Sequence, residues 1–210
     1  MSLRKKLIIA AAVVLVLSLS AYSTLAYLAA ETTAHNVVTS GGVHIELLDK
    51  TRDEGQETAE VETLRDFTTA YPNGLAVLPG SEASKVVAVS ADAESADCWV
   101  RVKLVQQVTT PEGVMPAEQY KDKITLNLDG NWLQKEGEDG WYYYNKVLTG
   151  GDKTTNLLDG VTFKGPDMGN EFKNSSYTIM VQAQAVQAAH NQSAADGVNS
   201  VLDVQGWPQA

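Results

Sequence analysis

Residues 97–108 read DCWVRVKLVQQV and carry the strongest strand signal in the chain. Their apolar residues recur with a period close to two, which is typical of a strand that buries one face. A second β-branched stretch, KVVAVS at residues 85–90, comes just before it, across the short polar link ADAESAD. Two such stretches joined by a short link predict a pair of adjacent antiparallel strands.

The same alternation extends outward in both directions from these two stretches. It predicts further strands at residues 43–47, 124–128, 161–163 and 176–189, and an edge strand at 61–67. Turn signals separate these strands at 71–74 (YPNG) and 79–80 (PG). The charged residues 49–60 (DKTRDEGQETAE) predict a solvated loop. Short helical segments are expected within 116–123 and 194–202. This pattern predicts a single all-β sandwich domain over residues 41–210.

Two aromatic-rich runs, NWLQK at 131–135 and WYYYN at 141–145, flank a glycine-containing loop and predict a β-hairpin. On the second strand Trp141 and Tyr143 face one way while Tyr142 and Tyr144 face the other, so at least one pair is expected in the core. The outward pair has two interpretations. It stabilises cross-strand packing, or it stacks on sugar rings as in a carbohydrate-binding sandwich.

The N-terminus has the layout of a secretory signal, with Arg4, Lys5 and Lys6 followed by an apolar run from Leu7 to Leu17. Small residues at Thr24 and Ala26 predict cleavage before Tyr27, which makes residues 1–26 a signal peptide. The alternative is an uncleaved membrane anchor, because residues 7–30 contain no charge. Both interpretations place the rest of the chain outside the cytoplasm, and membrane contact is expected only through an uncleaved signal.

Without residues 1–26, 13 basic and 26 acidic side chains remain, a net charge of −13. This charge disfavours binding to nucleic acid. The one cysteine, Cys98, cannot form an internal disulfide and is expected to be a small buried residue of its strand, with a reactive or intermolecular thiol as the alternative.

No constellation for catalysis or cofactor binding is visible. His35, His44 and His190 lack the spacing of metal ligands, and the chain contains no Gly-x-Ser-x-Gly or phosphate-binding glycine motif. We therefore predict no catalytic residue, cofactor or metal ligand. The carboxylates of Asp92, Glu94 and Asp97 leave two interpretations, a calcium loop or an ordinary solvated turn.

Five features in order resemble the TasA/camelysin family of exported bacterial proteins. They are the N-terminal junction, the turn at 79–80 before a valine-rich strand, the strand CWVRV at 98–102, the hairpin GWYYY at 140–144 and the strand AQAVQA at 183–188. The resemblance implies a jelly-roll-like antiparallel β-sandwich with one or two short helices, preceded by a signal helix. It also implies a secreted subunit of biofilm-matrix fibres on a Gram-positive cell surface, processed by a SipW-type signal peptidase.

The resemblance further implies assembly by donor-strand exchange, in which the N-terminal segment of one subunit completes the sheet of the next. Here the donor segment would lie within residues 27–40, with the candidate donor residues Tyr27, Leu28, Thr33, His35, Val37 and Val38. The expected partners are further copies of the chain and the peptidase, and an accessory matrix protein stays open. Camelysin-type relatives are described as metallopeptidases, but this sequence contains no metal-ligand motif that would support that activity. A secreted carbohydrate-binding sandwich and a camelysin-like metallopeptidase remain the alternative functions.

Overall fold

The computed structural model describes residues 36–39, 42–189, 191 and 200–208, and these residues form a two-sheet, all-β fold. The predicted signal peptide at 1–26 and most of the predicted tail helix lie outside the described residues. Only η6 (Val201–Asp203), a single 3₁₀ turn, is described at the end of that tail. Ser200 caps it, because its hydroxyl accepts a hydrogen bond from the Leu202 N–H while Asp203 reaches back to the Ser200 N–H.

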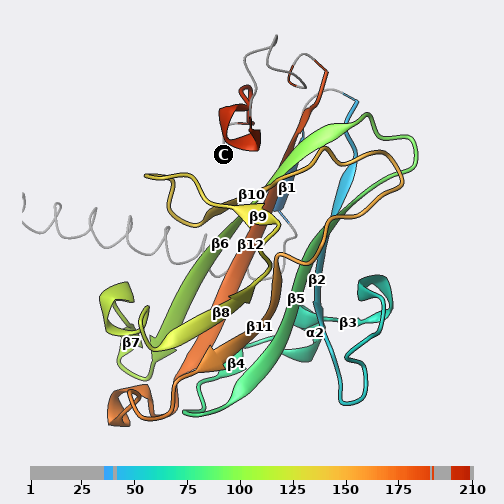
Figure 1. Ribbon diagram of the computed structural model, residues 1–210. Helices are drawn as coiled ribbons and strands as arrows, with labels where there is room; N and C mark the ends of the chain where they lie inside the picture. Colours follow the sequence, from blue (N-terminus) through green and yellow to red (C-terminus); the bar gives the residue numbers. More distant parts are fainter. Residues whose placement is uncertain (1–35, 40–41, 190, 192–199, 209–210) are drawn as a thin grey trace, which may run out of the picture. The chain divides into compact units, whose positions relative to one another are not determined.

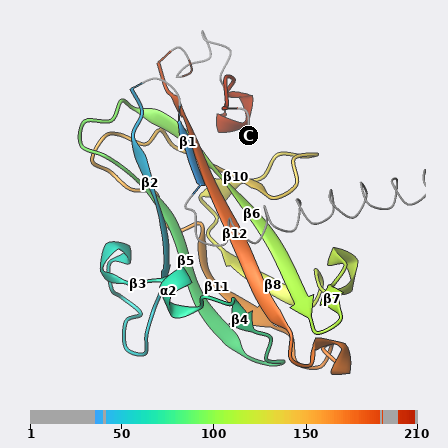
Figure 2. The same ribbon diagram turned by 180° about the vertical axis from the view of Figure 1, so that it is seen from behind.

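The larger sheet has the strand order β1-β12-β6-β10-β9, with β4 also paired to β12 and β7 to β6. Its long centre is the antiparallel pair of β6 and β12, which run side by side in both views (Figure 1, Figure 2). The strands are β1 (Asn36–Thr39), β4 (Leu75–Ala76), β6 (Cys98–Thr110), β7 (Gly113–Val114), β9 (Trp132–Leu133), β10 (Trp141–Tyr144) and β12 (Ser176–Gln187).

The smaller sheet has the order β3-β2-β5-β11-β8, and all its described pairs are antiparallel. Its strands are β3 (Arg65–Asp66), β2 (Ile45–Thr51), β5 (Glu82–Ala91), β11 (Leu158–Phe163) and β8 (Ile124–Leu128). The predicted strands at 43–47, 85–90, 97–108, 124–128, 161–163 and 176–189 therefore all exist, with boundaries shifted by a few residues.

The main core lies between the sheets and takes alternate residues from both. Val87 and Val89 of β5, Val100 of β6 and Ala183 of β12 are all fully buried in it. Because the period-two pattern places every second side chain on one face, each long strand contributes a row of such residues. This shared core confirms the all-β, two-sheet prediction.

The predicted aromatic hairpin is confirmed by the pairing of β9 with β10, in which Tyr143 lies opposite Leu133 and Tyr144 opposite Trp132. The loop ends at Gly140, which adopts a φ of +78°. A Cβ on Gly140 would lie 2.9 Å from the carbonyl oxygen of Leu104 on β6, so this turn needs glycine for its backbone conformation and for the close approach.

The prediction that residues 85–90 and 97–108 form neighbouring strands is wrong. β5 lies in the smaller sheet between β2 and β11, whereas β6 lies in the larger sheet between β12 and β10. The polar link turns through a hydrogen bond from the Ser95 N–H to the Asp92 carbonyl, and the chain crosses from one sheet to the other. Both strands contribute one face to the main core, and that pattern is the same for two neighbours in one sheet and for two strands in opposite sheets.

The predicted solvated loop at 49–60 begins too early. β2 continues to Thr51, and Asp49 is buried beside Lys85 of β5, at 6% exposure. A charged residue at the start of a polar run looks solvated in sequence, but an opposite charge on the neighbouring strand allows it to be buried.

The edge strand predicted at 61–67 is also mostly wrong, because Arg65–Asp66 alone is a strand. A 3₁₀ turn, η2 (Val61–Thr63), precedes it and a short helix, α2 (Phe67–Ala70), follows. Val61 packs with Leu64 on the outer face of the smaller sheet, against Leu48, Val86 and Ala88, which form a second small cluster. The segment therefore buries Val61 and Leu64 as a turn and does not pair as a strand along its whole length.

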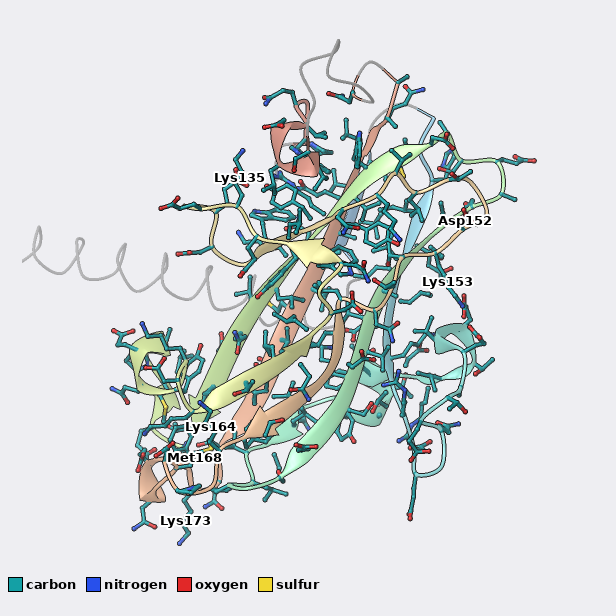
Figure 3. All side chains as sticks on the ribbon, in the orientation of Figure 1. Lys135, Asp152, Lys153, Lys164, Met168 and Lys173 are labelled. Carbon is teal, nitrogen blue, oxygen red and sulfur yellow. The ribbon has the colours of Figure 1, made fainter. Side chains whose placement is uncertain are left out.

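Exposed ion pairs lie on the solvent side of η2. Lys153, labelled in Figure 3 beside this segment, lies 2.6 Å from a Glu60 carboxylate oxygen and 3.0 Å from one of Glu62. Two further 3₁₀ turns are described. η3 (Ala117–Gln119) falls inside the helical segment predicted at 116–123, and η4 (Asn170–Phe172) was not predicted.

Candidate functional site

The outer edge of β12 is divided between two very short strands. β4 pairs with Ser176 and Tyr177, and β1 pairs with Gln182–Ala185. None of the described strands pairs with residues 178–181 along this edge. An edge held by short strands and left partly unpaired is a place where an extended segment can add to a sheet.

β1 is the one described strand that pairs in parallel with its neighbour. Asn36 lies opposite Gln182, Val37 opposite Ala183 and Thr39 opposite Ala185. Val37 is half-buried and packs against the main core, Val38 is half-buried on the other face, and Thr39 is exposed. β1 ends the strand order of its sheet, so its far side has no partner strand among the described residues.

The predicted donor residues divide at the start of β1. Val37 and Val38 lie in this strand, while Tyr27, Leu28, Thr33 and His35 lie outside the described residues, as do the predicted cleavage residues Thr24 and Ala26. The resemblance implied a donor segment here. The structure adds which strand it pairs with, in which direction, and which side chain reaches the core.

A second candidate site, the Arg101 cluster, lies on the outer face of the larger sheet. It consists of Arg101, Gln184, Glu138, Trp141, Tyr143 and Trp207. Nε and Nη2 of Arg101 donate hydrogen bonds to Oε1 of Gln184 at 2.9 and 2.8 Å, and Nη1 donates to the Tyr143 hydroxyl oxygen at 3.0 Å. The Tyr143 hydroxyl in turn donates to the Glu138 carboxylate.

These contacts shift two ionisation equilibria. The hydrogen bond from Tyr143 lowers the pKa of Glu138 below its ordinary value, and a hydrogen bond from Lys135 and its positive charge lower it further. Burial, followed by the hydrogen bond to Glu138, raises the pKa of Tyr143. The cluster is therefore a charge-assisted network with a neutral phenol at its centre.

The guanidinium of Arg101 also lies between aromatic rings, 4.1 Å from the Trp141 ring centre and 4.7 Å from that of Trp207. Trp207 meets Tyr143 edge-on at 5.7 Å. Around them, Trp99 and Val186 pack with Val201 and Val204 of the C-terminal segment. Tyr143 of the outward pair is thus covered by the chain's own residues, and Trp141 is half-buried beside Arg101. Tyr142 and Tyr144 lie in the main core, which confirms that one pair is buried there.

No metal-binding geometry is found in the described part of the chain, where no three His, Cys, Asp or Glu residues lie close enough together to hold an ion. Asp92, Glu94 and Asp97 are separately exposed. His44 is exposed too, while His35 and His190 lie outside the described residues.

Cys98 is fully buried, which confirms its expected place in the strand. Burial, with a smaller effect from Asp97, raises the pKa of its thiol to about 11. The thiol therefore stays protonated at neutral pH and is a poor nucleophile.

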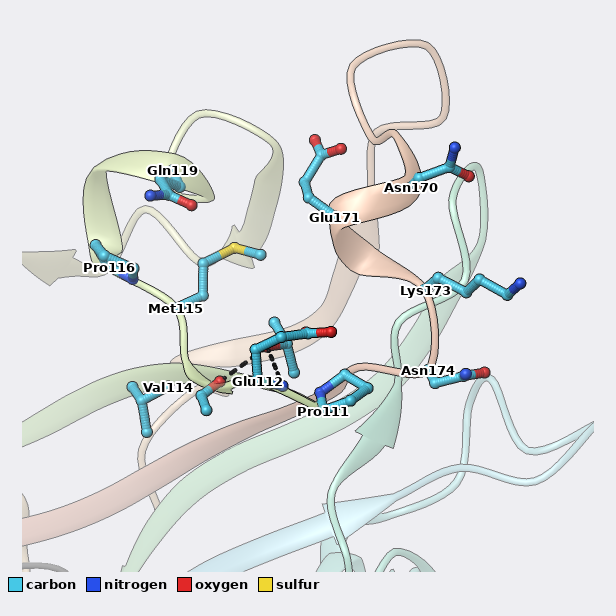
Figure 4. Close-up of a pocket in the computed structure, with 12 residues that line it drawn as sticks. Pro111, Glu112, Val114, Met115, Pro116, Gln119, Asn170, Glu171, Lys173 and Asn174 are labelled. Carbon is cyan, nitrogen blue, oxygen red and sulfur yellow. Dashed lines mark hydrogen bonds between the residues drawn. The ribbon is translucent and has the colours of Figure 1, made fainter.

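One open depression of about 690 Å³ lies at the other end of the larger sheet, between the loop around β7 and η4 (Figure 4). Met115 and Val114 contribute apolar surface, and Glu171 points toward it from η4, while Lys173 lines the rim with its side chain turned away. Both charged residues are exposed, and Glu171 is paired with Lys123 at 3.1 Å. The depression contains no arrangement of groups that indicates chemistry.

Sequence reasoning missed two features: the role of Arg101 and the buried pair of Lys85 and Asp49. In both cases the signal was a single basic residue inside an otherwise apolar strand, CWVRV or ASKVVAV. A charge at such a position is either a solvent-facing residue or a paired one, and the sequence does not distinguish them.

Comparisons of the chain with protein-family models, with curated proteins and with solved structures found no match. Within the described ranges, none of the helices combines the length and the apolar character that crossing a bilayer requires.

Proposed function

We propose that this protein is an exported structural subunit of extracellular biofilm-matrix fibres, which assembles head-to-tail by donor-strand exchange after residues 1–26 are removed. A SipW-type signal peptidase performs the cleavage, and the fold belongs to the jelly-roll-like sandwiches of the TasA/camelysin type. The proposal gives the chain a structural role on a Gram-positive cell surface and no catalytic one.

The observation that supports it is the parallel docking of β1 on the outer edge of β12. A parallel neighbour cannot be joined to β12 by a tight hairpin, so β1 is a separate piece that completes the sheet edge. The same register can form between two copies, with Val37 of one subunit opposite Ala183 of the next. Such a contact joins two different surfaces, so it propagates as an open filament.

The register also supports a longer donor strand in the fibre. β1 places Asn36 opposite Gln182, and it runs parallel to β12. A donor continued toward its N-terminus in this register places His35 opposite Val181 and Thr33 opposite Ile179. These acceptor residues belong to the edge that lacks a described strand partner, and Ile179 and Val181 are core residues. Exchange would thus form more backbone residue pairs along β12 than the four that β1 forms.

The small size of β1 makes its detachment and exchange energetically accessible. Each backbone hydrogen bond contributes only about 0.5–1.5 kcal/mol net, so a four-residue edge strand is weakly held. Cleavage acts as the switch in this proposal, because a donor still joined to a membrane-embedded signal cannot reach another subunit. The net charge of −13 without residues 1–26 keeps free subunits soluble until they pair.

The test compares two purified chains, one beginning at Tyr27 and one at Gly41, by electron microscopy. We expect fibres from the first, and from the second a folded monomer that binds a synthetic peptide of residues 27–40. A scrambled peptide of the same composition is the control. Fibres from the chain that begins at Gly41 would overturn the proposal, as would a donor peptide that binds no better than its scrambled control.

A further inference from the structure

A lysine and an aspartate are buried together inside the smaller sheet, away from the proposed assembly edge. Nζ of Lys85 on β5 lies 2.6 Å from Oδ1 of Asp49 on the adjacent strand β2, and the two side chains are 0% and 9% exposed. This inference does not depend on the proposed function.

The pair faces the interior of the sandwich. Asp49 lies opposite Val87 in the register, and Lys85 is two residues before Val87, so both side chains share the face of β2 and β5 that carries the main core. Nζ of Lys85 lies 3.6 Å from the centre of the Phe67 ring of α2. The amine and the carboxyl group are therefore enclosed by apolar side chains and held in contact.

Such surroundings favour the uncharged form of the Lys85 amine. Burial, which outweighs the opposing attraction of Asp49, lowers the pKa of the Lys85 amine. A proton passed from the ammonium to the carboxylate leaves a neutral amine, which is a nucleophile, beside a neutral carboxylic acid, which is an electrophile. Water, which would otherwise solvate the ions and hydrolyse the product, is kept out.

We propose that Lys85 and Asp49 condense into an intramolecular isopeptide bond that links β2 to β5. The Nζ lone pair attacks Cγ of the protonated Asp49 carboxyl group, and a new C–N bond forms. The Cγ–O bond to the hydroxyl then breaks, and the hydroxyl leaves as water with a proton from the nitrogen. Nothing is oxidised or reduced, and no further reactant is needed.

The condensation is expected to be slow and to follow folding. Nζ of Lys85 and Oδ1 of Asp49 are in direct contact at 2.6 Å, so the proposed proton transfers can take place within the pair. The unfolded chain holds the two residues 36 positions apart and in water, where the groups are charged. Cross-linked material should thus accumulate while the folded protein is incubated.

The chain supplies its own control for this reaction. Lys50 and Asp66 also join β2 to a neighbouring strand with an Nζ–Oδ1 distance of 2.6 Å, but their side chains are 16% and 52% exposed. The two pairs have the same chemistry and distance and differ in burial. If burial drives the condensation, only the buried pair should react.

The experiment is peptide mapping of the whole folded chain by mass spectrometry at increasing incubation times. We expect a peptide in which Asp49 and Lys85 are joined, lighter than its two components by one water, with loss of tryptic cleavage after Lys85. Lys50 and Asp66 should stay unlinked. Asp49→Asn should give the same linked peptide by losing ammonia, and Lys85→Met should give none.

Peptide mapping of the wild-type chain tests the proposal even if a variant fails to fold. An unlinked pair throughout prolonged incubation of folded protein would overturn the proposal and leave an ion pair only. Equal linkage of the exposed control pair would also overturn it, because burial would then not be the cause.

Discussion

Val37 of β1 lies opposite Ala183 of β12 in a parallel pairing, and it is the β1 side chain that packs against the main core. The attachment of the N-terminal strand therefore depends on one half-buried apolar contact and a few backbone hydrogen bonds. Thr39, two residues further along β1, also pairs with β12, but its side chain is exposed.

Val37→Asp should detach β1 and abolish fibre formation, because a carboxylate at this place loses hydration against an apolar surface. We expect the docking of the strand to weaken by about 1–3 kcal/mol. Light scattering and electron microscopy of the processed chain measure assembly. Thr39→Asp is the control, since it adds the same charge at an exposed position of the same strand. If both variants assemble equally, the contact of Val37 does not control docking.

Trp207→Ala should lower the free energy of unfolding by about 1–2 kcal/mol, because the ring contributes both an edge-on contact with Tyr143 and a cation–π contact with Arg101. Urea denaturation followed by tryptophan fluorescence measures the change. Gln205→Ala, an exposed substitution in the same segment, should have almost no effect. Equal stability of the two variants would show that the C-terminal segment does not hold the Arg101 cluster.

Gly74→Ala should destabilise the fold more than Gly55→Ala. Both glycines have positive φ, +78° and +83°, so alanine is strained by about 1–2 kcal/mol at either position. A Cβ at Gly74 would additionally lie 2.6 Å from the Thr178 Cγ2 and 2.7 Å from the Tyr177 carbonyl oxygen, whereas none of the described atoms lies within 4 Å at Gly55. Thermal melts of the two variants compare strain alone with strain plus a clash against the edge of β12.

Lowering the pH should weaken the Arg101 cluster through Glu138. The pKa of this carboxyl group is lowered from 4.5 by the hydrogen bond from Tyr143, so its ionised form stabilises the folded state. That contribution is complete above the unfolded value and is lost as the pH falls through the lower, folded value.

Glu138→Gln should therefore cost stability at neutral pH and cost progressively less as the pH falls below about 4.5. Urea midpoints across this range measure the difference between the two proteins. Glu136→Gln, an exposed change in the same loop, is the control. A difference between wild type and Glu138→Gln that does not change with pH would contradict the prediction.

The sequence by itself determined where the long strands lie. Alternation along residues 97–108 and 176–189 reports that one face of each is buried, and the structure places β6 and β12 there. The hairpin of β9 and β10 was equally predictable, because two aromatic runs around a short glycine-containing loop leave little choice of partner. Burial of one aromatic pair followed from the same periodicity.

Only the tertiary structure decided how these strands are arranged. Period two says that β5 and β6 each place a row of side chains in a core, but it is the same whether they pair within one sheet or lie in opposite sheets, and they lie in different sheets that share the main core. Asp49 looked solvated until Lys85 was found beside it, because the energy of a buried charge depends on a partner 36 residues away. Local patterns encode burial, while pairing depends on contacts between distant residues.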